Sequence, residues 1–178
     1  MSRLFFPICA LFIAMSLASP VAQEAPSSIE LDGGVTLPLA AQARRTHLLG
    51  SIEFYQVRIY ANGSLHDAAA LASTSTPKAL RIDVGYAEDI RQSVSFDWQR
   101  ELIPGLETPA ITQLRRIFAP LRAGDVVQID YTRTKGTTIR VNRDVAVSRG
   151  SHEVMLAFLD HWIGQRPMSE EMKQALLR

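Results

Sequence analysis

The residues from Ile52 to Ala61, with the sequence IEFYQVRIYA, constrain the fold more than any other stretch of the chain. Most of them are β-branched or aromatic, and they are followed by Asn62-Gly63, which is typical of a long strand that ends in a turn. Side chains alternate between the two faces of a strand. One face carries Tyr55, Val57, Ile59 and Ala61. We expect this face to look into the core.

Tyr55 is the one residue of this face with a polar tip, and a buried tyrosine hydroxyl needs a hydrogen-bond partner. Arg45 and Arg44 lie ten and eleven residues upstream, so a strand pair would bring a guanidinium near the hydroxyl. A guanidinium suits a carboxylate or phenolate because it donates two parallel hydrogen bonds. We therefore predict that one arginine and Tyr55 bind an anionic head group. The alternatives are a surface arginine pair and a core tyrosine bonded to a carbonyl.

The N-terminus has the pattern of a secretory signal peptide. Arg3 is followed by LFFPICALFIAMSLA, an apolar run of about fifteen residues, which is the length of a signal-peptide core. The run is short and contains Pro7, which argues against a retained transmembrane helix. Small residues suit cleavage after Ala18 or Ala22. We predict a signal peptide over residues 1–22 and an exported, periplasmic domain over residues 23–178.

The remaining composition excludes several classes of site. The single cysteine, Cys9, lies in the predicted signal peptide, so the mature chain would have no disulfide and no thiolate. Removal of Arg3 reduces the 19 Lys and Arg residues to 18, against 18 Asp and Glu, and a balanced charge argues against nucleic-acid binding. The histidines lack metal-ligand spacing, and phosphate-binding and nucleophile motifs are absent. We expect no metal and no cofactor.

Stretches of strand period and of helix period are segregated along the chain. Strands are expected over 29–39 as a hairpin around Asp32-Gly33-Gly34, then over 52–61, 80–86, 127–131, 139–141 and 145–147. Helices are expected over 65–72, 90–102, 108–121 and 151–163, with a last one capped by Ser169. At 178 residues and 47% hydrophobic, the chain fits one domain. The prediction is an α+β fold, an antiparallel β-sheet with helices packed on one face.

Three segments of the chain resemble one known family. They are GDVVQIDYTRTKGTTIRVN, VMLAFLDHWIGQRPMSEEMKQALL and, upstream, FYQVRIYANGSL. The sequence is similar to the chalcone isomerase-like family, in its exported bacterial branch, over roughly residues 30–178. The resemblance implies an antiparallel sheet covered on one side by helices, with a ligand cleft between the layers. The family contains plant enzymes that cyclise chalcones to flavanones, fatty-acid-binding relatives, and many bacterial members of unknown role.

The resemblance also implies site residues. In the enzymes an arginine before the central strand and a threonine on it attend the substrate oxyanion. The arginine position falls on Arg45 or, with another gap, on Arg44, and the threonine position falls on Tyr55. A small hydroxyl residue and its apolar neighbour on the last long helix correspond to His161 and Trp162, with His161 toward the rim of the apolar stripe. The resemblance does not place the catalytic tyrosine or asparagine of the enzymes within residues 79–112.

These observations predict an exported domain that binds a small amphipathic anion such as a fatty acid. The first alternative is a cofactor-free isomerase, an intramolecular lyase of the chalcone isomerase type, in which the arginine steadies an oxyanion. The second alternative is an interaction module of the cell envelope. Its docking surface would be the other face of the central strand, with Phe54, Gln56, Arg58 and Tyr60.

Overall fold

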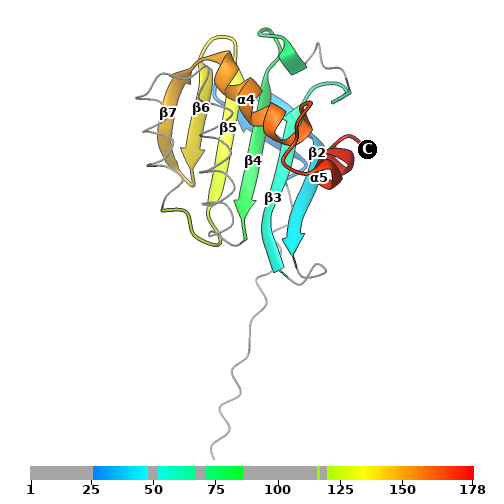
Figure 1. Cartoon of the computed structure of the whole chain (residues 1–178). Coiled ribbons are helices and arrows are strands. Elements are labelled where there is room, and N and C mark those ends of the chain that lie inside the picture. Colours follow the sequence, from blue (N-terminus) through cyan, green and yellow to red (C-terminus); the bar gives the residue numbers. More distant parts are fainter. Residues whose placement is uncertain (1–25, 48–51, 67–70, 86–115, 117–119) are drawn as a thin grey trace, which may run out of the picture.

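The computed structural model of the chain describes residues 26–47, 52–66, 71–85, 116 and 120–178. Its main feature is a seven-stranded antiparallel sheet in which each strand pairs with the next one along the chain. The strands are β1 (Ser28–Leu31), β2 (Val35–His47), β3 (Ile52–Ala61), β4 (Lys78–Val84), β5 (Val126–Thr132), β6 (Gly136–Val141) and β7 (Asp144–Gly150). Helix α4 (His152–Ile163) crosses one face of the sheet, and α5 (Glu170–Leu176) follows it (Figure 1). The predicted α+β class is confirmed.

The main core lies between the sheet and the two helices. All four residues predicted to face inward from β3 are buried there. Helix α4 contributes Val154, Met155, Phe158, Leu159 and Trp162. Helix α5 contributes Met172 and Leu176 and lies against β2. We call the sheet face that meets these helices the inner face, and the opposite one the outer face.

The helices begin and end where the sequence places them. Ser151 precedes α4 in an extended conformation, and the side chain of Ser169 accepts a hydrogen bond of 3.3 Å from the backbone N–H of Met172 in α5. The first turn of each helix carries acidic residues, whose negative charge stabilises the positive N-terminal end of the helix dipole. Gly164 ends α4, and its N–H donates to the carbonyl of Asp160 at 2.9 Å. The capping residues therefore define both helices locally.

A β-bulge in β2 sends its two halves to different faces of the sheet. Leu39 lies opposite Tyr60, but the next pair is Ala41 opposite Ile59, so Ala40 is an extra residue. The apolar side chains of β2 before the bulge, Val35, Leu37 and Leu39, consequently share the outer face with Tyr60. There Leu37 forms a second buried cluster with Leu31 of β1, Tyr60 of β3 and Ala79 of β4. Figure 1 shows the blue start of β2 behind the sheet, on the side away from α4.

Several predictions lie outside the residues that the structure describes. The expected helix over 90–102 is among them, with half of the helix over 65–72 and most of the helix over 108–121. So is the predicted signal peptide over residues 1–22. Within the described ranges, no helix combines the length and the apolar character that a membrane span requires.

Candidate functional site

Arg45 and Tyr55 lie directly opposite each other on the paired strands β2 and β3. Opposed residues of an antiparallel pair point to the same face, with Cβ atoms about 5 Å apart. For this pair it is the inner face, because Tyr55 belongs to the main core. Tyr55 is 1% exposed, whereas Arg45 is partly exposed. The pair therefore places a buried phenol and a partly exposed arginine on the same face, at opposed positions of the two strands.

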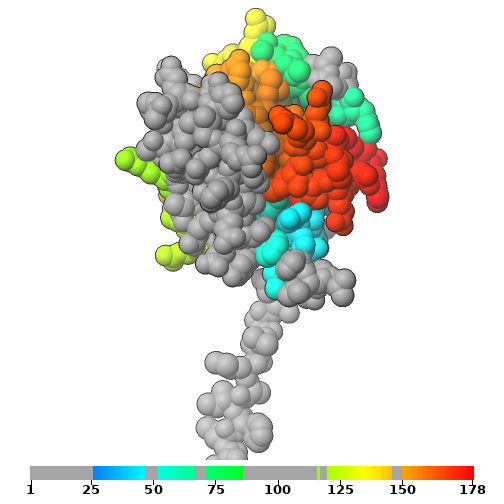
Figure 2. Space-filling view, viewed as in Figure 1, coloured from blue at the N-terminus to red at the C-terminus, as the bar shows by residue number. Residues whose placement is uncertain are grey.

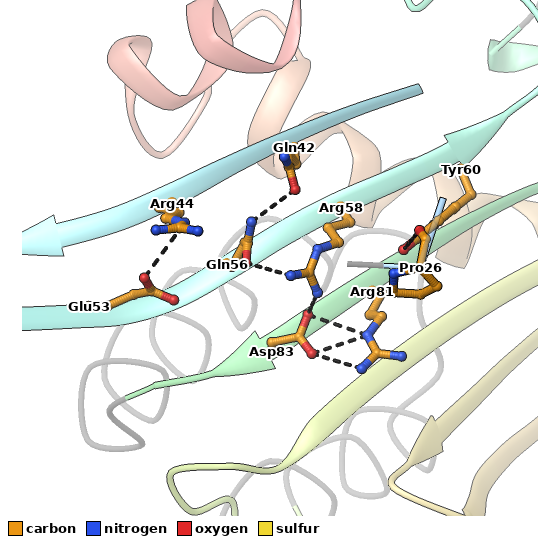
Figure 3. A network of polar contacts seen from close by, with 9 residues as sticks. All are labelled: Pro26, Gln42, Arg44, Glu53, Gln56, Arg58, Tyr60, Arg81 and Asp83. Carbon is orange, nitrogen blue, oxygen red and sulfur yellow. Dashed lines mark hydrogen bonds and ion pairs between the residues drawn. The ribbon is translucent and has the colours of Figure 1, made fainter. Parts of the chain in front are cut away.

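Arg44 is the alternative arginine, and it points to the outer face. It lies opposite Gln56, and its side chain is exposed. Its Nε is 3.7 Å from the carboxylate of Glu53, a residue whose side chain is also exposed (Figure 3). The register of β2 and β3 therefore separates the two candidates. Arg45 shares a face with Tyr55, and Arg44 does not.

Met168, which the sequence analysis did not single out, contacts the phenol of Tyr55. The hydroxyl of Tyr55 donates to the sulfur of Met168 at 3.7 Å. Met168 lies between α4 and α5, and its backbone N–H donates to the carbonyl of His161 at 2.9 Å. This backbone bond folds the segment 164–169 back over the end of α4. Since no local sequence pattern reports such a return, Met168 had no signal that could have identified it.

His161 and Trp162 are both buried at the C-terminal end of α4. They are 4% and 1% exposed, and their rings meet edge to face with centroids 5.2 Å apart. Consecutive helix residues point about 100° apart, so both are buried only if the helix is covered on two sides. The sheet covers one side, and His161 is more buried than its predicted rim position. In Figure 2, the orange and red residues of α4 and α5 form one continuous surface.

The outer face of β3 and β4 carries a buried network of polar side chains (Figure 3). Arg58 donates to the carboxylate of Asp83 and, at 2.6 Å, to the side-chain oxygen of Gln56. Arg81 binds the same carboxylate at 2.9 Å. Gln56, Arg58 and Tyr60 are 5%, 4% and 0% exposed. Three of the four residues of the predicted docking face are therefore covered within the chain, and only Phe54 is partly exposed.

A second outer-face network fixes the β1–β2 turn. Arg140 of β6 binds both Asp130 of β5 and Asp32 in this turn, and Lys135 lies 3.4 Å from Asp32. Arg140 is the main reason that the pKa of Asp32 lies below its ordinary value, whereas burial raises the pKa of Asp130. These contacts hold the β1–β2 hairpin across the outer face. Their role is structural.

A charged side chain, Lys78, is buried on the inner face of the sheet. It lies opposite Ala61 on β3 and opposite Tyr131 on β5, and it is 0% exposed. Its ammonium donates to the carbonyls of Leu71 at 2.5 Å and Ser73 at 2.8 Å. Burial lowers its pKa from 10.5 to about 8. The alternation of KALRIDV, which puts Lys78 in phase with Leu80, Ile82 and Val84, is the signal that could have revealed it.

The described residues contain no group of three or more His, Asp or Glu side chains that could hold a metal ion. They contain instead hydrogen-bond donors and apolar side chains. A guanidinium and a phenol face one side of the sheet, and apolar side chains from α4 and α5 lie beside them. Such an arrangement suits a ligand with one acceptor group and an apolar body.

Comparisons with known proteins agree with the fold. A family model described as chalcone isomerase-like matches residues 22–178. Among solved structures, a fatty-acid binding protein of Arabidopsis thaliana (AtFAP1) superposes with a TM-score of 0.55 at 14% sequence identity. The match covers 84% of this chain and 95% of the Arabidopsis chain. At that identity it shows a shared fold. A search of curated proteins finds no match.

Proposed function

The chain belongs to the chalcone isomerase-like family, and we propose that it binds a fatty acid or a similar small amphipathic anion without converting it. The observation that carries the proposal is the pair formed by Arg45 and Tyr55 on the inner face. A carboxylate can accept hydrogen bonds from a guanidinium and a phenol together, and such charge-assisted bonds are the strong ones. The head group would be held at the margin of the core, and the tail would lie among apolar side chains.

Met168 gives the site a means of admitting the head group. Its thioether accepts the hydrogen bond of the Tyr55 hydroxyl, but sulfur is a weak acceptor. A carboxylate is a much stronger acceptor and would replace it. Methionine is unbranched and flexible, so its side chain moves aside at low cost. We therefore expect Met168 to change position when a ligand binds.

Two observations favour binding over catalysis. By the resemblance, Tyr55 occupies the position that carries a threonine in the family's enzymes, and their catalytic tyrosine and asparagine are not placed within residues 79–112. The fold is also that of AtFAP1, which is described as a fatty-acid binding protein. The proposal includes export to the periplasm, with residues 1–22 acting as a signal peptide. N-terminal sequencing of the mature protein tests this part.

Native mass spectrometry of protein purified from its own compartment tests the binding function. We expect a bound mass that disappears after delipidation, and a rise in melting temperature when a fatty acid is added back. Empty native protein, with no thermal shift on addition of fatty acids, would contradict the proposal. An absorbance assay with a chalcone completes the test, because conversion of the chalcone would identify an isomerase instead.

The charge of Arg45 should determine affinity for the acid. Loss of a hydrogen bond to a charged group costs about 1.5 to 3 kcal/mol, so Arg45→Ala should weaken fatty-acid binding about 10- to 100-fold. Arg44→Ala is the matched control, because Arg44 is exposed and points to the outer face. Calorimetric titration of both variants measures the effect. An equal loss of affinity in the two variants would show that the register does not select the binding arginine.

The hydroxyl of Tyr55 should contribute to binding whether or not the ligand is charged. Tyr55→Phe keeps the ring and should lower the affinity for a fatty acid about tenfold, the effect of one hydrogen bond to a charged group. A fatty alcohol of the same chain length should also bind Tyr55→Phe more weakly, but it should bind Arg45→Ala nearly as well as the wild type. The same titrations with both ligands separate the two contributions. Unchanged affinity of Tyr55→Phe for both ligands would remove Tyr55 from the site.

A further inference from the structure

The contact between Lys78 of β4 and His152 of α4 joins the first turn of the helix to the sheet. Nζ of Lys78 lies 3.0 Å from Nε2 of His152, and the two residues are 0% and 9% exposed. An ammonium group has donors and no acceptor. Nε2 of His152 must therefore accept this hydrogen bond, which places the proton of the neutral imidazole on Nδ1.

The Lys78 ammonium has a complete set of acceptors, and none of them is negatively charged. Its three protons point to His152 and to the carbonyl oxygens of Leu71 and Ser73. The ring of Tyr131 adds a favourable surface, with its centroid 5.2 Å from Nζ and 4.4 Å from the centroid of the His152 ring. Nζ thus forms one positively charged centre held by neutral groups. Its stability depends on His152 remaining an acceptor.

The other groups around His152 do not supply a compensating carboxylate. Burial is the main reason that the pKa of His152 lies below its ordinary value, and the charge of Lys78 adds to this effect. Glu153 opposes it from the next position of α4, where its side chain is exposed to solvent. The neighbouring strands contribute neutral groups: the hydroxyl of Tyr131 donates to Thr74, and that of Thr137 donates to the carbonyl of Ser151. In the described part of the chain, Lys78 and His152 form no salt bridge.

We propose that the Lys78–His152 contact is an acid-sensitive switch, in which protonation of His152 releases the first turn of α4 from β4 and from residues 71–74. An imidazolium cannot accept a hydrogen bond, so the added proton removes one of the three acceptors of Lys78. It also places two positive charges about 3 Å apart in a buried site, where charges interact more strongly than in water. In the open state both groups are solvated and can be charged together.

The direction of the response follows from linkage. The closed state holds His152 neutral and has a pKa below the ordinary 6.5 of histidine. As the pH falls below this value, the open state takes up a proton more readily than the closed state, and acidification therefore favours opening. One proton changes the ratio of open to closed molecules by at most about tenfold per pH unit.

Hydrogen exchange of the mature protein at pH 7 and about pH 5 tests the switch, because histidine titrates across this range. Protection factors, which correct for the intrinsic exchange rate at each pH, are compared for residues 71–76 and 152–158. We expect them to fall at the lower pH in the wild type, by up to about 20-fold between pH 7 and pH 5, and to fall much less in His152→Gln. Glutamine accepts a hydrogen bond at both pH values. The amides of β3 serve as the internal reference.

Two results would overturn the proposal: no fall in the wild type, or an equal fall in His152→Gln. If His152→Gln does not fold, an NMR titration of the His152 imidazole in the wild type tests the switch instead. A midpoint below 6.5, which moves upward in Lys78→Met, supports the switch, and a midpoint at or above 6.5 in the wild type contradicts it. If the protein binds a ligand as proposed, opening of the switch should also release that ligand faster at low pH. This consequence rests on the proposed function. The exchange experiment does not depend on any ligand, so the proposed switch and the proposed binding function can be contradicted separately.

Discussion

Asp83→Ala is expected to destabilise the protein by about 3 to 5 kcal/mol, because it leaves buried positive charge without a counter-charge. Asp83 accepts hydrogen bonds from both Arg58 and Arg81 (Figure 3). These arginines lie directly opposite each other on β3 and β4, and their side chains are 5% and 18% exposed. Without the carboxylate, two guanidinium groups would face each other in a poorly solvated site. Urea unfolding measures the change in free energy.

Two control variants make this prediction specific. Glu53→Ala removes the carboxylate that pairs with Arg44 at the surface, where the side chains of Arg44 and Glu53 are 57% and 41% exposed. This change should lower the free energy of unfolding by at most about 1 kcal/mol. Arg58→Met should cost less than Asp83→Ala, because Asp83 then remains paired with Arg81. If Asp83→Ala costs no more than Glu53→Ala, the network does not stabilise the sheet.

Because Lys78 is buried, the protein should become more stable at alkaline pH, where this side chain loses its charge. Its pKa is about 8 in the folded protein, below the ordinary 10.5. Between these two values the unfolded chain binds a proton that the folded protein does not hold, so the free energy of unfolding rises with pH. Each unit of pKa difference is worth about 1.4 kcal/mol, which gives a total rise of about 3 kcal/mol. Urea unfolding curves recorded from pH 7 to about pH 10.5 measure it.

The comparison with Lys78→Met isolates this contribution. Other groups that titrate at alkaline pH are common to both proteins, and their effect cancels in the difference between the two curves. Lys78→Met should lose the rise, while Lys135→Met, which changes a half-exposed lysine in the turn before β6, should keep it. Parallel curves for the wild type and Lys78→Met would show that Lys78 is not charged and buried as described.

The position of Tyr55 could be predicted from the sequence, whereas the arginine that shares its face could not. The alternation of IEFYQVRIYA places Tyr55 in the core, and the structure confirms it. The choice between Arg45 and Arg44 depends on which residue of β2 lies opposite Tyr55. A shift of one residue in register moves every side chain of a strand to the other face. That register is set by packing along the whole strand pair, which a local pattern does not contain.

Met168 and Lys78 show a second limit of sequence reasoning. The contact of Met168 with Tyr55 joins residues 113 positions apart. Lys78 and His152 are 74 positions apart. Strand period alone would have placed Lys78 on the inner face, but it could not supply its acceptors. A buried ammonium is tolerated only where carbonyls and an imidazole converge on it, and this convergence is a property of the assembled core.

The amino-acid sequence by itself determined the elements of this protein: which faces of β3 and α4 are apolar, where Ser169 begins α5, and where Gly164 ends α4. These depend on side-chain period and on capping residues, which act within a few positions. The tertiary structure decided the rest. The bulge at Ala40 turned the apolar side chains at the start of β2 to the outer face, and the strand register put Arg45 rather than Arg44 opposite Tyr55. The position of the bulge and the strand register depend on burial and on the pairing of buried charges between distant segments, so they are fixed only when the whole sheet forms.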